Sequence, residues 1–306
     1  MVAFWHTIFS ELGFGVQLSS PSSKELYHKG QYTIASDTIC YPAKLMHGHI
    51  QDLIDKKVRH IFYPCLTFNI DEEKTDNHYN CPVVAYYPEV IFNNFEWKDN
   101  ILLHPYLGIH RKKDFTKKFQ KFLNSNFSHK FTSLQVEKAV NAGYEEYKSY
   151  MEKIQNQGDA YLQYGIEHKL PIFVLCGRPY HLDHEVNHGL DHLLEKEESI
   201  ILSEDSLGHH TRKVDTDVLN QWTYHGRMYG AADYIANQKY PNIHLIQLVS
   251  FGCGLDAITT DEIRAILESK GKLYTQIKID EITNMGAVKI RLRSLIETSK
   301  QKGNAK

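Results

Sequence analysis

The 306-residue sequence is poor in cysteine, in long apolar runs and in excess charge, and each shortage excludes a class of protein. With a formal net charge of -2, the chain has no field that would draw it to nucleic acid or to an anionic membrane. No apolar run approaches the roughly 20 residues that span a bilayer. The N-terminal stretch MVAFWHTIFSELGFG lacks the basic region and cleavage site of a secretory signal. The sequence therefore predicts a cytoplasmic protein with neither a nucleic-acid partner nor a membrane partner.

The five cysteines are an odd number, spread over a long chain without an export signal. They therefore do not indicate a disulfide framework, and we expect reduced thiols. A reduced cysteine is either an inert core residue or a metal ligand. Taken singly, each is more often a core residue, because free cysteine is among the most buried residue types.

Strand patterns alternate with helix patterns along most of the chain, and 42% of the residues are apolar. This alternation predicts an α/β protein with two Rossmann-like (flavodoxin-like) parallel-sheet domains joined by helices. We expect a first α/β domain over residues 1–108, a helical connector over 109–169 and a second α/β domain over 170–306. Because the chain opens on a helix where such a domain normally opens on a buried strand, a first strand is expected to be missing.

Some segments carry specific expectations. Residues 16–20 (VQLSS) predict a short buried strand, and residues 81–92 (CPVVAYYPEVIF) predict another apolar extended run. Residues 133–169 place apolar and aromatic side chains at helical spacing and predict one long bridging helix. In TTDEIRAIL, Thr259 or Thr260 is expected to cap a helix, with an acidic residue three positions later.

Four of the cysteines fall beside predicted element ends. Cys40 opens a predicted helix, Cys65 and Cys253 end predicted strands, and Cys81 precedes the predicted extended run. Ligands of parallel sheets gather beyond the carboxyl ends of the strands, and thiolates suit iron-sulfur clusters, zinc or copper. The wide spacing of these cysteines excludes the compact knuckles of zinc fingers and ferredoxins. Cys176 also ends a predicted strand, but a core thiol is the favoured interpretation.

Polar side chains in GRPYHLDHEVNHG follow a predicted strand. Arg178 and His181 are candidates to meet an oxygen-rich substrate or a phosphate, and His188 is a weaker one. The alternative is that these histidines are solvated or bonded to the backbone. Lys44, one turn after Cys40, would either stabilise a thiolate or lie in solvent.

Several stretches together resemble the acyl-CoA dehydratase activase-related family: FWHTIFSELGF, SDTICYPAKLMHGHIQDLI, IFYPC, NCPVV, LCGRPYHLDHEVNHGLD, SEDS and SFGCGLDAITTDEIRAILESKGKLYTQIKIDEITNMGAVKIRLRSL. The layout is more distantly similar to the subunits of 2-hydroxyacyl-CoA dehydratases. The resemblance implies an iron-sulfur cluster, 4Fe-4S or double-cubane, held by Cys40, Cys65 and Cys253. Cys81, in NCP, matches a further motif and is the candidate fourth ligand. Three thiolates leave one iron of a four-iron cluster open, whereas four close it.

The function that this resemblance implies is that of a cytoplasmic iron-sulfur protein of an anaerobe. It would take low-potential electrons from an ATP-driven activator for reductive or dehydration chemistry on a small substrate such as an acyl-CoA. The sequence has no glycine-rich phosphate loop of the usual spacing, so the ATPase is expected in a partner. A homodimer and a heterodimer both stay open. The alternative is a non-catalytic electron-relay or assembly domain, a detached part of a larger activase, and a chain without metal is a third option.

Overall fold

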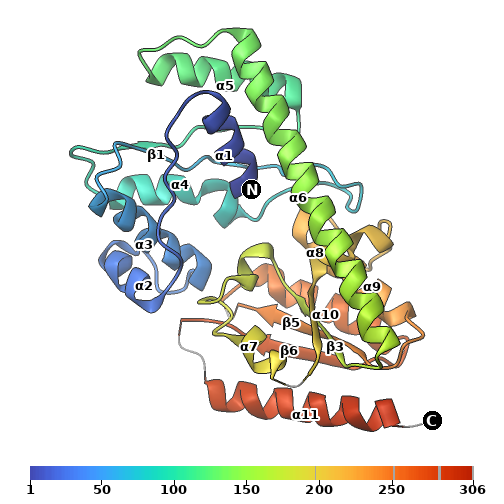
Figure 1. The fold of residues 1–306 in the computed structure, drawn as a ribbon. Coiled ribbons are helices and arrows are strands. Elements are labelled where there is room, and N and C mark those ends of the chain that lie inside the picture. The colour runs from blue at the N-terminus through green and yellow to red at the C-terminus, as the bar shows by residue number, and fades with distance from the viewer. Residues whose placement is uncertain (197, 251, 282–283, 305–306) are drawn as a thin grey trace.

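The computed structural model describes residues 1–196, 198–250, 252–281 and 284–304, with side chains as far as residue 299. Within these ranges helices alternate with short strands (Figure 1). In chain order the elements are α1 (Val2–Glu11), α2 (Lys24–Gly30), η1 (Gln31–Thr33), α3 (Tyr41–Asp55), β1 (His60–Phe62), α4 (Pro82–Asn94), β2 (Ile101–Leu103), α5 (Lys112–Asn126), α6 (Ser133–Glu167), β3 (Ile172–Cys176), η2 (Pro179–Leu182), α7 (Leu190–Glu195), β4 (Ile200–Ser203), α8 (Glu204–Leu207), η3 (Gly208–His210), α9 (Thr223–Asn237), β5 (Ile243–Val249), α10 (Gly254–Glu268), β6 (Tyr274–Lys278) and α11 (Met285–Asn304).

The larger sheet consists of β4, β3, β5 and β6 in that order, and each neighbouring pair is parallel. Alternate side chains of β3 face opposite sides. Phe173 and Leu175 pack with α7, α11 and the start of α3, whereas Ile172, Val174 and Cys176 pack with α6, α9 and α10. Burial on both faces explains why β3 and β5 are almost wholly apolar runs. From β3 the chain continues to β4 on one side of it and then crosses to β5 on the other side. The direction of winding therefore reverses between β3 and β5.

The smaller sheet pairs β1 with β2 in parallel, with Phe62 opposite Leu103. Ile61 and Leu102 pack with α3 and α4 in one apolar cluster. Phe62 packs instead with a cluster rich in aromatic side chains from α1, α5 and α6. The structure is therefore α/β with parallel sheets of two and four strands within the described residues, which confirms that part of the predicted fold.

Helix α6 runs past both sheets, as Figure 1 shows. Thr132 begins it with a capping box, accepting from the Gln135 amide while the Gln135 side chain accepts from the Thr132 amide. Near its start, a Cβ on Gly143 would lie 2.5 Å from Ile8 of α1; further along, one on Gly158 would lie 2.6 Å from Ser206 of α8. Glycine at these positions permits the close helix contacts. The long helix predicted over this region is confirmed.

Two predicted extended segments are wrong. Residues 16–20 are irregular, and Leu18 is 55% exposed, so no buried strand forms there. The second segment is the helix α4: Cys81 is its N-cap and Pro82 follows at the first helical position, where a missing amide hydrogen costs nothing. Ala85 and Ile91 on one face of α4 are buried, and this packing outweighs the strand preference of the valine and tyrosine residues.

The predicted cap of α10 is also wrong. This helix begins at Gly254 with Cys253 as N-cap, so Thr259 and Thr260 lie inside it. The Thr259 hydroxyl donates to the Leu255 carbonyl at 2.8 Å, one turn earlier. The first turn carries Asp256 instead, which complements the positive end of the helix.

Candidate metal centre

Three cysteines occupy the N-cap positions of three helices: Cys40 begins α3, Cys81 begins α4 and Cys253 begins α10. The Cys81 sulfur accepts a hydrogen bond of 3.4 Å from the Val84 amide. The backbone amide of Ala43 favours the thiolate of Cys40 and acts to lower its pKa. The amides of Asp256 and Leu255 have the same effect on Cys253. Unpaired amides and the positive end of a helix favour a thiolate over a thiol, and at these positions they oppose the effect of burial.

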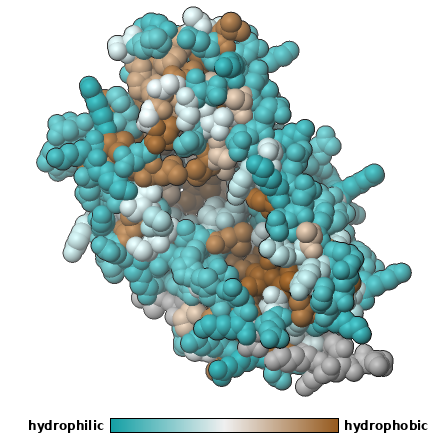
Figure 2. Space-filling view, viewed as in Figure 1, coloured by the Kyte–Doolittle hydropathy of each residue, from teal (hydrophilic) through white to brown (hydrophobic). Residues whose placement is uncertain are grey.

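The fold brings these three thiols together although they are distant in the sequence. Cys40 interacts electrostatically with both Cys81 and Cys253. Their loops also touch: a Cβ on Gly252, next to Cys253, would lie 2.8 Å from the carbonyl oxygen of Thr38. Figure 2 shows a recess on one face, between the part that carries α1, α4 and α5 and the part that carries the larger sheet. Cys40 and Cys81 belong to helices beside the smaller sheet, and Cys253 to the larger one.

The thiols of Cys40 and Cys253 are protonated at neutral pH unless a cation displaces the proton. Burial raises the pKa of Cys40 and of Cys253, and the Arg178 guanidinium opposes the rise in both. A metal that binds here would release protons from these sulfurs, so its affinity would rise with pH.

Cys65 has a different environment. It lies just beyond β1, is 1% exposed and pairs through its backbone with the segment around Tyr106. Burial, together with nearby Glu89, raises the pKa of its thiol to about 11. Tyr63 is close enough to interact electrostatically with Cys65, Cys40 and Cys81, so Cys65 borders the group.

Arg178 follows β3 at the point where the winding of the larger sheet reverses. Its Nη1 donates to Oδ1 of Asp256 and its Nη2 donates to Oδ2 at 2.9 Å, while Nη2 also donates to Nε2 of His181 at 3.0 Å. The Ser250 amide donates to the same carboxylate at 2.8 Å. Arg178 is 3% exposed, and its Nε has no partner among the described residues. It interacts electrostatically with Cys253 and Cys40, so it supplies fixed positive charge beside them.

His181 supports Arg178 and does not itself face solvent. It is fully buried, and burial, with the adjacent Arg178, lowers its pKa well below the usual range, so the imidazole is neutral. Its role in the structure is to accept from the guanidinium and fix its orientation.

Other polar candidates have partners elsewhere. Lys44 donates to the Asp37 carbonyl at 2.7 Å and to Glu281 at 2.5 Å. His188 bonds to the Asp280 carbonyl at 2.6 Å. Cys176 is packed in the core against α9, and burial raises the pKa of its thiol.

Sequence reasoning missed two buried groups beside β3 and β4. Glu204 is fully buried at the start of α8, neither of its oxygens has a partner among the described residues, and burial raises its pKa, so it is a neutral acid. His225 in α9 is likewise unpartnered at both nitrogens, and burial lowers its pKa to about 3. The acidic pair directly after β4 was the available signal for Glu204, because polar residues at strand ends mark sites.

Two further groups of ligand atoms lie within 4.8 Å of one another on the described surface. One joins Asp159 of α6 with His209 and His210, and the other joins His184, Asp191 and His192. They are separate from the cysteines. Neither was predicted: the first joins segments about 50 residues apart, and the second depends on how the loop with His184 folds back on α7.

Taken together, parallel sheets and thiols at three helix N-termini define an α/β protein with a candidate soft-metal centre. The family described as "CoA enzyme activase uncharacterised domain" matches residues 1–207, and the chain belongs to that family. This confirms the predicted activase-related relationship. The match includes Cys40, Cys65 and Cys81, and Cys253 lies beyond it. A search of curated proteins found no match to the chain. Among the described residues, no helix is both long and apolar enough to span a membrane.

Proposed function

We propose that this member of the activase-related family binds an iron-sulfur cluster through Cys40, Cys81 and Cys253. The observation that carries the proposal is that Cys40, Cys81 and Cys253 each cap a helix, with Cys40 near the other two thiols and near Arg178. Cys65 is the candidate fourth ligand. The chain would accept low-potential electrons from an ATP-driven activator and use them on a small substrate such as an acyl-CoA, in the cytoplasm of an anaerobe.

The spacing of these sulfurs argues against a single zinc ion shared by all three, and we infer a polynuclear centre instead. Sulfurs that share one tetrahedral zinc lie about 3.8 Å apart, given Zn–S distances of about 2.3 Å. Among the described residues, these three sulfurs do not all lie within 4.8 Å of one another. In a four-iron cluster each sulfur binds a different iron, so wider spacing is required. A 4Fe-4S or double-cubane cluster is therefore the proposed cofactor.

A bound cluster would supply one-electron transfer and, if one iron lacks a thiolate, Lewis acidity. The chain supplies the rest. Three helix N-termini and the Arg178 guanidinium offset the negative charge that thiolates and added electrons bring. Burial and the nearby Asp205 raise the pKa of the Glu204 carboxyl, so an added negative charge in its neighbourhood would make it hold its proton more tightly.

The strand order also supports a cofactor between two units. The order β4-β3-β5-β6 corresponds to the first four strands of a flavodoxin-like sheet, whose ligands bind where the winding reverses. Arg178 and Cys253 follow the two strands that flank that point. As part of this proposal, we extend the Rossmann-like description to the region around the smaller sheet. We expect the chain to assemble with a second chain as a homodimer or a heterodimer.

The alternative function is electron relay or assembly without catalysis, and the number of ligands separates the two. A fourth thiolate from Cys65 would close the cluster to substrate. Cys65 is buried and lies near Tyr63, which also lies near Cys40 and Cys81, and this proximity supports the alternative.

Anaerobic reconstitution with iron and sulfide tests the proposal. We expect wild-type protein to bind both and to gain a broad visible absorption band. Cys40→Ala, Cys81→Ala and Cys253→Ala should each lose most of the iron and sulfide, whereas Cys176→Ala, which removes a core thiol, should keep them. Zinc without sulfide in the wild type, or equal loss in the Cys176 control, contradicts the proposal.

The Cys65→Ala variant decides between the two functions. If it retains the cluster, three thiolates suffice and one iron is open to substrate. If it loses the cluster as Cys40→Ala does, the centre has four ligands and the relay function is supported.

A further inference from the structure

A second site lies beyond the carboxyl ends of β1 and β2, on the smaller sheet. It is a cavity of about 620 Å³, within the range of small-molecule sites. Residues from three segments line it: the loop after β1, the turn after β2 and the first turns of α5. They are Phe68, Asp71, Asn77, His78, Tyr79, Gly108, His110, Arg111, Asp114, Phe115 and Lys118. Ligands of parallel sheets bind at this edge, so the location itself favours a binding site.

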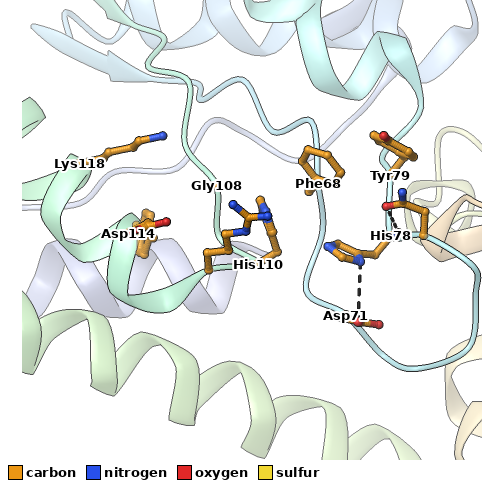
Figure 3. A pocket seen from close by; sticks show the side chains of 11 residues that line it. Phe68, Asp71, His78, Tyr79, Gly108, His110, Asp114 and Lys118 are labelled. Carbon is orange, nitrogen blue, oxygen red and sulfur yellow. Dashed lines mark hydrogen bonds and ion pairs between the residues drawn. The ribbon is translucent and has the colours of Figure 1, made fainter.

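Aromatic rings form one wall of the cavity. The ring of Phe68 stacks with that of Tyr79, with centroids 4.6 Å apart, and lies 4.6 Å from the ring of His110. His78 lies 5.3 Å from His110. Figure 3 shows Phe68, His78 and Tyr79 on one side of the cavity, opposite Lys118 and Asp114 of α5. Such a wall suits a flat aromatic group.

Two cations face this wall without a partner. Arg111, the N-cap of α5, and Lys118 make no ion pair or side-chain hydrogen bond with any residue that the structure describes. Arg111 also sits at the positive end of this 15-residue helix, and Lys118 lies in its second turn. Unpaired cations in a concave site attract anions, and the fork of Arg111 suits phosphate oxygens in particular.

Two imidazole nitrogens and one carboxylate complete the polar lining. Nε2 of His78 and Nδ1 of His110 are buried without a partner among the described residues, so a ligand that bonds to them would remove a desolvation cost. Asp114 has no described side-chain partner, and its carboxylate would accept from ligand hydroxyls. Asp71 is already engaged, 3.8 Å from Nδ1 of His78.

We propose that this cavity binds a nucleoside phosphate. The base packs on the wall of Phe68 and Tyr79, the ribose hydroxyls donate to Asp114, and the phosphates meet Arg111 and Lys118. A simple anion would leave the aromatic wall unused, and an uncharged aromatic compound would leave both cations unused. Nucleotide binding at this cavity does not depend on the cluster. The nucleotide could belong to an acyl-CoA, and this further identification alone rests on the proposed function.

Calorimetric titration of the metal-free chain with ADP, adenosine, inorganic phosphate and CoA tests the inference. ADP should bind saturably and at least tenfold more tightly than adenosine or phosphate. Lys118→Ala should weaken ADP binding roughly tenfold, the effect of one charge-assisted hydrogen bond. Lys117→Ala is the matched control, because it removes a neighbouring exposed lysine of α5 outside the cavity lining, and it should change little. Phe68→Ala should weaken ADP and adenosine but not phosphate.

The outcomes separate the sources of the ligand. Tighter binding of CoA than of ADP supports an acyl-CoA, and the reverse supports a free nucleotide. Absence of saturable ADP and CoA binding overturns the inference, as does phosphate binding as tight as ADP binding or an equal effect of Lys117→Ala. The iron and sulfide content of Lys118→Ala should match that of the wild type. A failure to bind nucleotide would therefore not contradict the cluster proposal, and a failure to bind iron and sulfide would not contradict nucleotide binding.

Discussion

Replacing Asp256 with alanine should leave the Arg178 guanidinium charged and buried with little to balance it. Both side chains are 3% exposed, and Asp256 accepts from two guanidinium nitrogens and from the Ser250 amide. After the substitution, the partners left to the guanidinium among the described residues are the neutral His181 and the nearby Tyr180 ring. Water cannot easily replace the lost carboxylate at a site buried this deeply.

The expected cost follows from this burial. Removing one partner of a buried ion pair typically destabilises a protein by about 3–5 kcal/mol. The control lies one turn further along α10: Asp261 is 79% exposed and pairs with Arg264 at 3.3 Å. Exposed pairs contribute about 0–1 kcal/mol, so Asp261→Ala should have a small effect. The double variant Arg178→Met, Asp256→Leu should be more stable than Asp256→Ala, since it removes both charges.

Urea unfolding of the metal-free protein, followed by circular dichroism and tryptophan fluorescence, measures these differences. The reasoning is refuted if Asp256→Ala lowers the free energy of unfolding no more than Asp261→Ala does. It is also refuted if the double variant is no more stable than Asp256→Ala, because the cost would then not arise from a stranded charge.

Three further predictions concern stability. Burial lowers the pKa of His47 to about 4, below its unfolded value near 6.5. As the pH falls from 6.5 to 4, His47 is protonated in the unfolded chain but not in the folded one, so the free energy of unfolding should decrease by on the order of 3 kcal/mol. A His47→Phe variant should show a flatter dependence of the urea midpoint on pH. Gly48→Ala should lower the melting temperature, because its Cβ would lie 2.1 Å from the Leu26 carbonyl oxygen, whereas Gly15→Ala, with open space around it, should not; equal effects would contradict this. Thr132→Ala should cost about 1 kcal/mol in urea unfolding by removing the α6 cap, and no loss would mean that packing alone fixes the helix start.

Local patterns predicted the elements whose periodicity and burial agree. The capped apolar stripe of α6 and the apolar runs of β3 and β5 are of this kind. The prediction failed for α4, whose valine and tyrosine residues favour strands in isolation. There, the cap and the packing of one face against the smaller sheet decide the conformation.

The candidate centre was predicted only in part. Strand ends and helix starts drew attention to Cys40, Cys65, Cys81 and Cys253, and the family resemblance supplied the chemistry. Which thiols interact most directly depends on how α3, α4 and α10 are placed, and the structure couples Cys40 with Cys81 and Cys253. The ligand set itself stays a prediction.

The sequence by itself determined the α/β alternation, the family, and the scarcity of thiols that makes each one a candidate. Those properties depend on side-chain chemistry and on periodicity over a few residues. The tertiary structure alone decided that three helix N-termini converge, that Arg178 is balanced by Asp256, and that cations and aromatic rings share a cavity beyond the smaller sheet. These depend on contacts between segments far apart in the chain, and such contacts are fixed by the packing of whole elements, which no local pattern encodes.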